Sequence, residues 1–209
     1  MARPIKIAVT GGAGSGKTFV CRRFKELGMN VISADTLARN AVKPDSAARE
    51  QILNCFGEKV LSGDGSLNRQ MLRRMMITDA DARKTLERII HPVIQSLMAA
   101  EMVEAEKRGD PAVIVEVPLL FESGIADRFH VVIVVVADTE LRIKRLMDRD
   151  KVSRTEAKAL LSVQMPDGEK IKHSDFAIKN NGTSDQMKRS TDDIYEKIYQ
   201  KYLKRIETA

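Results

Sequence analysis

Short runs of almost uninterrupted apolar residues recur along the chain and alternate with segments whose apolar residues follow a helical period. The clearest run is Val131–Val136, which consists of aliphatic side chains only. The runs that we predict to be strands cover residues 5–10, 30–33, 112–117, 131–136 and 176–178. Such apolar strands are typical of a parallel sheet that is covered on both faces. Their alternation with helices predicts a three-layer α/β fold around a mainly parallel five-stranded sheet.

A long and almost wholly helical segment separates the second predicted strand from the third. Its apolar residues follow the helical period at positions 86, 89, 90, 93, 94, 97 and 98, and Gly109 closes the pattern. Pro92 lies inside this pattern, and a proline there predicts a kink or a restart of the helix. Earlier in the segment, Asp64-Gly65 marks a turn before a helix expected over residues 67–76.

Helices are also predicted in the last third of the chain. One begins at Ser153, because Ser153 and Glu156 have the spacing of a capping box. Another begins near Ser184 and places Ile194, Ile198 and Tyr202 on one face. We expect this helix to close the structure by packing its apolar face on the rest of the fold.

The composition is that of a globular protein. The 209 residues include 43% hydrophobic and 31% charged residues, enough for one domain with a full core and an inserted subdomain. No stretch approaches the length of a membrane-spanning segment, and the first residues lead directly into a strand, which leaves no room for a signal peptide. Cys21 and Cys55 lack the number and spacing of a disulfide framework or a metal site. We therefore expect a reducing, cytoplasmic location.

The net charge of +6 leaves two classes of anionic ligand open. A basic surface suits nucleic acid, but it suits small substrates with several phosphates equally well. Aromatic residues make up only 4% of the chain and Trp is absent, so the sequence offers no platform for stacking bases. We expect small phosphate-bearing ligands and no nucleic acid.

A glycine-rich motif follows the first predicted strand and carries the strongest chemical signal. It has the pattern G-x-x-x-x-G-K-T and consists of Gly11, Gly12, Ala13, Gly14, Ser15, Gly16, Lys17 and Thr18. In a phosphate-binding loop (P-loop) of this pattern, backbone N–H groups surround the phosphates, Lys17 reaches the β- and γ-phosphates and Thr18 holds Mg²⁺. Val20, Phe24 and Leu27 then recur at helical spacing. A strand, a loop and a helix in this order favour the P-loop over a glycine-rich turn without a ligand.

Asp35 lies at the carboxyl end of the second predicted strand, which we expect to neighbour the loop that carries Lys17. Ligands of such sheets bind beyond the carboxyl ends of the strands. A carboxylate there could take the proton of an attacking hydroxyl group, or orient that group and a metal-bound water. The alternative is that Asp35 is the N-cap of a helix beginning at Thr36.

Basic residues are concentrated after the fourth predicted strand. At helical spacing, Arg142, Arg145 and Arg149 fall on one side of the helix that follows Asp138. Arginines on a mobile element commonly neutralise the charge of a phosphoryl group in transfer. The alternative is a solvated basic face whose charges pair with neighbouring carboxylates.

Three further segments have both a functional and a structural interpretation. His91 precedes Pro92 in an apolar helical stretch and is either a structural, hydrogen-bonded histidine or a catalytic one. Pro118–Glu122 follows the third strand and either lines a pocket or packs back on the sheet. Asn180–Gly182 follows the fifth strand and either contacts a base edge or forms a plain turn.

These motifs together resemble the dephospho-coenzyme A kinase family. The matching segments, in the same order, are Thr10–Thr18, Ile32–Asp35 with Ala38-Arg39, His91-Pro92, Pro118–Glu122, Arg145–Asp150 and Ile178–Gly182. The resemblance spans about residues 5–203, and its combination of motifs is far more specific than the P-loop alone. It implies a P-loop kinase that uses ATP and Mg²⁺ to phosphorylate the 3′-hydroxyl of dephospho-CoA. The implied organisation is a core of residues 1–34, 110–140 and 174–209, a helical substrate-binding insertion of residues 35–109, and a lid of residues 141–173.

The resemblance also implies roles for individual residues. The implied catalytic residues are Asp35 as general base, Lys17, and the lid residues Arg145 and Arg149. ATP binding is implied for Gly11, Gly12, Ala13, Gly14, Ser15, Gly16, Lys17, Thr18, Asn181 and Gly182. Acceptor binding is implied for Asp35, Arg39, His91, Pro118, Leu119 and Leu120, and a metal contact for Thr18. In one departure, Ser33 stands where the family often has a second Asp. We expect a monomer or a weak homo-oligomer that binds ATP and dephospho-CoA and no membrane.

Two other functions deserve comparison with this one. A GTP-driven switch usually needs a D-x-x-G segment that senses the γ-phosphate, and no Asp of this chain stands three residues before a Gly. The closer alternative is another P-loop kinase that acts on a small molecule or a nucleoside monophosphate.

Overall fold

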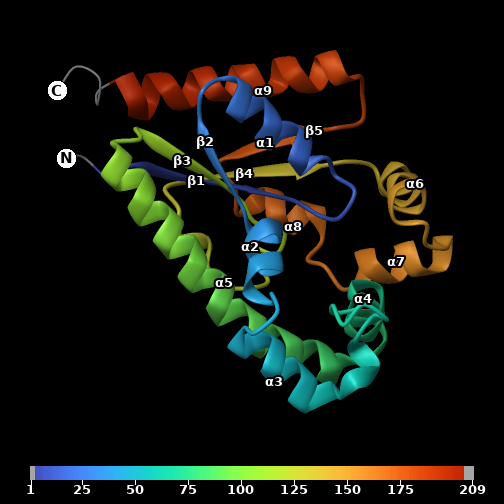
Figure 1. The fold of residues 1–209 in the computed structure, drawn as a ribbon. Coiled ribbons are helices and arrows are strands. Elements are labelled where there is room, and N and C mark those ends of the chain that lie inside the picture. Colours follow the sequence, from blue (N-terminus) through green and yellow to red (C-terminus); the bar gives the residue numbers. More distant parts are fainter. Residues whose placement is uncertain (1–2, 205–209) are drawn as a thin grey trace. The chain divides into compact units, whose positions relative to one another are not determined.

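The computed structural model describes residues 3–204, and its centre is a five-stranded sheet in which all paired strands are parallel (Figure 1). The strands are β1 (Ile5–Thr10), β2 (Asn30–Ser33), β3 (Ala112–Glu116), β4 (Val131–Val136) and β5 (Phe176–Lys179). Their order in the sheet is β2-β3-β1-β4-β5. The predicted α/β fold is therefore confirmed, with strand boundaries that differ by at most one residue from those expected.

The burial of each strand follows its place in the sheet. All residues of β3 and β4 are buried, as are the last four of β1 between them. The edge strands β2 and β5 each have only one buried residue. Central parallel strands need apolar side chains on both faces, which is why β3 and β4 gave the clearest sequence signals.

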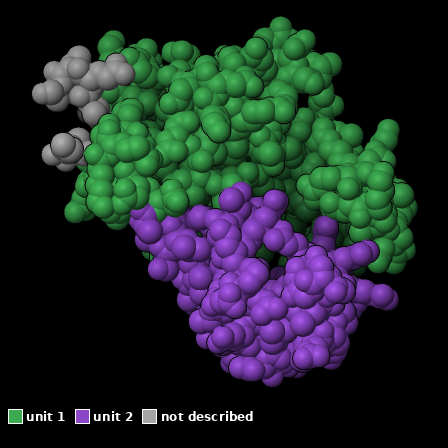
Figure 2. Space-filling model, in the orientation of Figure 1, with its two compact units in different colours: residues 1–33, 101–209 green, residues 34–100 purple. Residues whose placement is uncertain are grey.

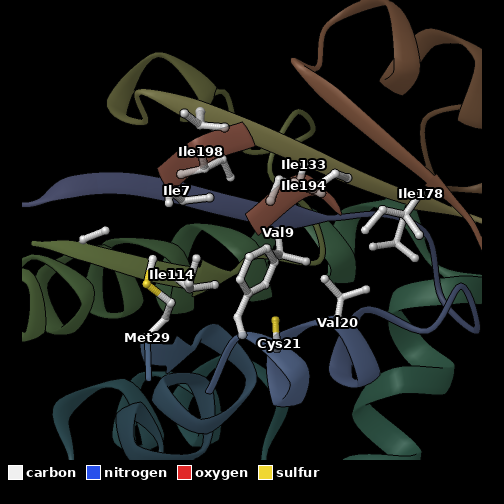
Figure 3. Packing of buried hydrophobic residues seen from close by; sticks show 14 of the residues in the cluster. Ile7, Val9, Val20, Cys21, Met29, Ile114, Ile133, Ile178, Ile194 and Ile198 are labelled. Carbon is white, nitrogen blue, oxygen red and sulfur yellow. The ribbon is translucent and has the colours of Figure 1, made fainter. Parts of the chain in front are cut away.

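Two helices cover one face of the sheet. They are α1 (Lys17–Glu26) and α9 (Ser184–Ile198), which pack on each other as well as on the strands (Figure 1). Val20 and Cys21 of α1, Ile194 and Ile198 of α9 and the sheet residue Ile133 belong to one apolar cluster, which Figure 3 shows. Removing this apolar surface from water supplies the main driving force for the layer.

The opposite face carries α8 (Asp167–Lys172), which contacts β4 (Figure 1). Four further elements belong to the same half of the fold as the sheet. They are α6 (Thr139–Asp150), α7 (Arg154–Ser162), η2 (Ala126–Arg128) and the π-helical turn η3 (Tyr199–Leu203), which follows α9. The predicted capping box at Ser153 is present, because the side chains of Ser153 and Glu156 each accept from the other's backbone N–H.

The chain divides into two compact units, drawn in different colours in Figure 2. We call Ala34–Ala100 the helical unit and the remainder the sheet unit. The helical unit contains α2 (Ala34–Ala41), α3 (Ala47–Phe56), η1 (Glu58–Val60), α4 (Arg69–Thr78) and the first part of α5 (Ala80–Arg108). Its separate apolar cluster includes the fully buried Ile52 and Val60.

Two helical predictions need correction. The helix α5 continues through Pro92, so the predicted restart is wrong, because a proline removes only one backbone donor and the rest of a 29-residue helix remains bonded. The helix predicted over residues 67–76 is α4, and it begins at Arg69 because the Asn68 side chain caps it by accepting from Met71 N. Leu67 instead forms an antiparallel bridge with Leu61.

Candidate active site

The carboxyl ends of four adjacent strands converge at one edge of the sheet unit. Strand β1 runs into the P-loop, and β3, β4 and β5 end beside it in parallel register. In open parallel sheets this edge is where ligands bind. The P-loop then leads into α1 at Lys17, so the positive end of the helix dipole faces the loop.

Glycine is required at Gly16, where the loop turns into α1 with φ of +103°. This left-handed conformation is costly for residues with a Cβ. A Cβ there would also overlap Nδ2 of Asn180, which donates to the backbone carbonyl of Ser15 at 2.7 Å. The close approach of Asn180 to the loop therefore depends on this glycine.

Lys17 is buried within the P-loop that precedes it. Its Nζ donates to the carbonyl oxygens of Gly11 and Gly12 at 2.9 and 3.1 Å. A lysine this buried needs hydrogen-bond acceptors to offset the loss of water. The loop thus holds a positive charge at the end of β1.

Thr18 lies next to a carboxylate that the sequence prediction did not assign. Its Oγ1 donates to Oε1 of Glu116 at 3.0 Å, and Glu116 is only 6% exposed. Glu116 is the last residue of β3 and stands in register with Val9 of β1 and Ser33 of β2. Strand β3 therefore lies between β1 and β2, and the expectation that the Asp35 strand neighbours the P-loop strand is wrong.

The electrostatic effect of Glu116 extends to Cys21 on α1. Burial raises the pKa of the Cys21 thiol strongly, the negative charge of Glu116 raises it further, and Lys17 lowers it by less. Cys21 therefore stays a neutral thiol at physiological pH and is not a candidate nucleophile.

Arg145 is the predicted lid arginine that lies against the P-loop. Its guanidinium donates to the carbonyl of Gly14 at 3.2 Å and to the carbonyl of Asn180 at 3.1 Å. Burial lowers the pKa of Arg145, but a guanidinium remains protonated in proteins. A fixed positive charge thus stands beside the loop.

The three arginines that the sequence places on one side of α6 have different environments. Arg142 is 6% exposed and bonded to Ala13 of the P-loop, whereas the Arg149 side chain is 64% exposed and pairs with Asp150 at 2.8 Å. Position along the helix explains the difference, because α6 meets the loop near its first turns and its last turn reaches solvent. Neither the mobile-arginine interpretation nor the solvated-face interpretation describes all three residues.

Asn181 and Gly182, predicted to bind ATP, are exposed residues that follow β5. The Asn181 amide exchanges two hydrogen bonds with Asp138, accepting from its N at 2.8 Å and donating to its Oδ1 at 2.7 Å. Both residues line an open hollow of about 510 Å³ at the start of α9. Asn180, the first residue of the predicted segment Asn180–Gly182, lies beside the P-loop itself, although the predicted ATP-binding residues included only Asn181 and Gly182.

Pro118 and Leu119 follow β3 and are partly exposed, whereas Leu120 is fully buried. The burial of Leu120 agrees with a loop that packs back on the sheet, and pocket lining by Pro118 and Leu119 stays a prediction. Glu122 accepts from the backbone N of Met165 at 2.9 Å and ties the loop to the segment after α7.

The remaining predicted residues lie in the helical unit. Asp35 and Arg39 are exposed on α2, and His91 is partly exposed on α5. Because α2 begins at Ala34, Asp35 lies in its first turn, and the N-cap interpretation is wrong. A first-turn carboxylate still interacts favourably with the helix dipole.

Within residues 3–204, no group of three or more His, Cys, Asp or Glu side chains has the arrangement of a metal site. Mg²⁺ at a nucleotide, however, takes one or two protein oxygens and completes its shell with phosphates and water. The oxygens of Thr18 and Glu116 fit that requirement.

None of the helices in the described residues is long and apolar enough to cross a membrane.

The parallel sheet, the loop around Lys17 and the Thr18–Glu116 pair define a nucleotide-binding protein of the P-loop class. The family model described as dephospho-CoA kinase matches residues 5–186. The dephospho-CoA kinase of Geobacter sulfurreducens is 41% identical over 193 residues, which cover 92% of this chain and 98% of that protein. The chain belongs to the dephospho-CoA kinase family and is an ATP-dependent kinase.

Solved structures agree with this assignment. The dephospho-CoA kinase from Campylobacter jejuni superposes with a TM-score of 0.67 at 32% identity, covering 93% of this chain and 97% of that one. The crystal structure of TT1252 from Thermus thermophilus has a TM-score of 0.78 at 32% identity, covering 94% and 99% of the two chains.

Proposed function

We propose that the chain transfers the γ-phosphoryl group of ATP to the 3′-hydroxyl of dephospho-CoA, giving CoA and ADP, the last step of coenzyme A biosynthesis. The observation that carries this proposal is the P-loop with its buried Lys17, in a chain that matches the family over residues 5–186. The phosphoryl donor then binds at the sheet unit, and we assign the acceptor chiefly to the helical unit.

Phosphoryl transfer depends mainly on positioning and on electrostatic stabilisation of the moving group. In our proposal the eight residues Gly11–Thr18 bind the phosphates and Lys17 places its charge on the transferring group. Arg145, held against Gly14 and Asn180, supplies a second positive charge. These fixed charges favour the transition state because they need no reorganisation during the reaction.

Mg²⁺ is the cofactor we propose, with Thr18 as its ligand and Glu116 as the neighbouring carboxylate. When bound, Mg²⁺ neutralises negative charge on the β- and γ-phosphates. The role of Glu116 is to orient the Thr18 hydroxyl and to add negative charge that favours a cation there.

For the acceptor, we assign Asp35 as the general base that takes the proton of the 3′-hydroxyl. A free hydroxyl is a weak nucleophile, and a carboxylate within hydrogen-bond reach can remove its proton as the new P–O bond forms. Residues that we assign to acceptor binding are Arg39, His91, Pro118 and Leu119, whereas the fully buried Leu120 side chain packs inward. The exposure of Asp35 and Arg39 leaves both side chains accessible to a ligand.

The hollow beside Asn181 and Gly182 is the site that we propose for the adenosine end of ATP. Its lining is mainly polar and includes the residues directly after β5, where Asn180 donates to the Ser15 carbonyl of the P-loop. We further propose that residues 141–173 act as a lid, with Arg149 at its outer end, residues 35–109 as the substrate-binding insertion, and residues 1–34, 110–140 and 174–209 as the core. In this proposal the part that closes lies between Arg145 and Gln164, since both of these residues are bonded to the P-loop, and its closure would exclude water that otherwise hydrolyses ATP.

We also propose that the protein works in the cytoplasm as a monomer or weak homo-oligomer and does not bind nucleic acid or membranes. The exposed free thiol of Cys55 supports a reducing compartment.

A panel of acceptors tests the proposed reaction. The purified chain is incubated with ATP, Mg²⁺ and dephospho-CoA, AMP, UMP, uridine or shikimate, and ADP formation and product mass are measured. We expect transfer to dephospho-CoA, with the added phosphate on the 3′-oxygen by NMR. Preferential phosphorylation of another acceptor would instead identify a different P-loop kinase.

A further inference from the structure

The guanidinium of Arg142 has a protein partner on each of its three nitrogens. Nε donates to the carbonyl of Ala13 at 2.9 Å, Nη1 to Oδ2 of Asp167 at 2.9 Å, and Nη2 to Oε1 of Gln164 at 3.3 Å. The side chain is 8% exposed. Arg142 is therefore bound within the protein and does not extend into the site.

These contacts engage both backbone groups of one P-loop residue, Ala13. The carbonyl of Ala13 accepts from Arg142, while its N–H donates to Oε1 of Gln164 at 2.9 Å. Gln164 thus bonds both Ala13 and Arg142, and Asp167 balances the charge of Arg142. The N–H and the carbonyl of Ala13 belong to two consecutive peptide units, so neither unit can rotate without breaking a hydrogen bond.

The two neighbouring glycines show how closely the loop lies on Arg142. A Cβ on Gly12 would overlap Nη2 of Arg142, and a Cβ on Gly14 would lie 2.9 Å from the Arg142 carbonyl oxygen. Even one additional methyl group at Gly12 would displace the guanidinium. The arc Gly12–Gly14 and Arg142 therefore form a matched pair of surfaces.

The segment that carries Gln164 and Asp167 is itself anchored. Glu122 accepts from Met165 N at 2.9 Å, and Nζ of Lys170 lies 2.9 Å from the same carboxylate. Lys170 is fully buried, so its charge needs this partner to offset desolvation. The segment is consequently fixed by groups outside the P-loop.

We propose that Arg142, Gln164 and Asp167 are positioning residues that hold the arc Gly12–Gly14 in its phosphate-binding conformation. They act through the backbone N–H and carbonyl of Ala13 and touch neither substrate nor reacting atoms. A small displacement of groups that surround a phosphate lowers both affinity and rate, because the site works by fixed geometry. The proposal rests on the proposed function only in taking ATP as the ligand of the loop.

A double-mutant cycle tests the coupling of Arg142 with Asp167. The variants are Arg142→Gln, Asp167→Ala and the double variant, and the measurements are equilibrium ATP affinity, kcat, both KM values and the melting temperature. We expect each single variant to weaken ATP binding about tenfold and the double variant to bind no more weakly than the weaker single one. The KM for dephospho-CoA should change less than twofold.

The matched control is Arg154→Gln. Arg154 pairs with Glu140 at 2.6 Å in the same region, but both side chains are more than half exposed. Exposed pairs contribute little, so this variant should leave ATP affinity and turnover unchanged.

Gly12→Ala perturbs the same contact from the loop side. Its backbone lies outside the left-handed region, so the added methyl group acts through its overlap with Arg142. We expect the loss of ATP affinity seen for Arg142→Gln, and no further loss when Gly12→Ala is added to Arg142→Ala. This pair keeps the proposal testable if Arg142→Gln fails to fold.

Two results would overturn the proposal. One is a lower melting temperature with unchanged ATP affinity and turnover, which makes the contacts structural only. The other is an absence of coupling between Arg142 and Asp167, seen as an unchanged ATP affinity of Asp167→Ala or as additive losses of ATP affinity in the double variant. It would mean that Arg142 acts on the nucleotide directly. Failure of the wild type to phosphorylate dephospho-CoA would refute the proposed function alone, because ATP affinity still reports on the positioning residues.

Discussion

The candidate residues of the sheet unit and those of the helical unit differ in how firmly their surroundings hold them. Lys17, the first residue of α1, and Glu116, the last residue of β3, are buried and bonded to the P-loop and to Thr18, respectively. Asp35 and Arg39 are exposed on α2. Groups that stabilise a phosphoryl transition state must be oriented before the reaction, whereas groups that meet an incoming acceptor need access to solvent. The contrast is what a kinase with a fixed donor site and an open acceptor surface requires.

The contrast separates two kinds of experimental outcome. A substitution of the buried residues Lys17 or Glu116 alters hydrogen bonds of the P-loop region together with the charge near the phosphates. A change in the exposed set alters chemistry with little effect on the free energy of unfolding, because exposed side chains contribute little to it. The following predictions test this separation.

Lys17→Ala should have the largest effect. It removes the buried charge at the P-loop, and we expect kcat to fall about a thousandfold. The far-UV circular dichroism spectrum should stay unchanged, since the apolar cluster beneath the sheet is not touched. The control is Lys25→Ala on the same helix, where the lysine is exposed and turnover should remain normal. Near-normal turnover of Lys17→Ala would refute the assignment of the loop.

Asp35→Asn should lower kcat about a hundredfold to a thousandfold, because it removes the proposed base. The melting temperature should change little, since the lost interaction with the α2 dipole is worth only about 0.3–1 kcal/mol at an exposed site. ATP affinity should be retained. Asp81→Asn is the control, as Asp81 occupies the first turn of α5 in the same unit and is exposed. Lost stability with normal turnover per folded molecule would assign Asp35 a structural role.

The strands and the P-loop could be predicted from the sequence because their signals are local. The apolar run of β4 and the Gly11–Thr18 motif each lie within a few consecutive residues. The order of the strands depends on pairing between residues far apart in the chain, and no local pattern encodes it. The prediction therefore placed β2 beside β1, although β3 lies between them.

Glu116 is a site residue that could not be assigned from the sequence because its role depends on the order of the strands. The sequence held a signal, since Glu116 is a lone carboxylate in an otherwise apolar strand. Its importance became clear only when the register placed it beside Thr18. The burial of Arg142 could not be predicted from the sequence either, because its partners are Gln164 in the loop after α7 and Asp167 at the start of α8.

Glu116→Gln should lower kcat about tenfold to a hundredfold, since groups behind a metal ligand typically contribute that much to activity. The amide keeps an acceptor for Thr18 but loses the negative charge. We therefore expect the Mg²⁺ concentration for half-maximal rate to rise, measured by titration at fixed ATP. An unchanged Mg²⁺ dependence would separate Glu116 from the metal and leave it as a structural partner of Thr18.

Arg145→Ala should have a smaller effect, with kcat falling about tenfold, as expected for loss of one charged hydrogen-bonding group. The fall in kcat should exceed the rise in KM for ATP, because a charge that acts mainly in the transition state has that signature. A pure KM effect would assign Arg145 to ground-state binding. Arg149→Ala, which changes an exposed residue on the same helix, measures whether the outer end of α6 contributes at all.

The two cysteines test the same comparison without any substitution. Each unit carries one free thiol, Cys21 in the sheet unit and Cys55 in the helical unit. Native protein treated with iodoacetamide at pH 8 should be modified at the exposed Cys55 of α3 and not at Cys21. The thiolate is the reactive form, and burial followed by the charge of Glu116 raises the pKa of Cys21 above its ordinary value of 9.0, so the thiolate is scarce at this pH. Mass spectrometry should find one adduct on the native chain and two on the unfolded chain. In Glu116→Gln the pKa of Cys21 should fall only in part, because burial is the larger cause, and native Cys21 should still resist modification. Equal labelling of both cysteines in the native protein would show that α1 opens readily, and the contrast between a firmly held and an open unit would not stand.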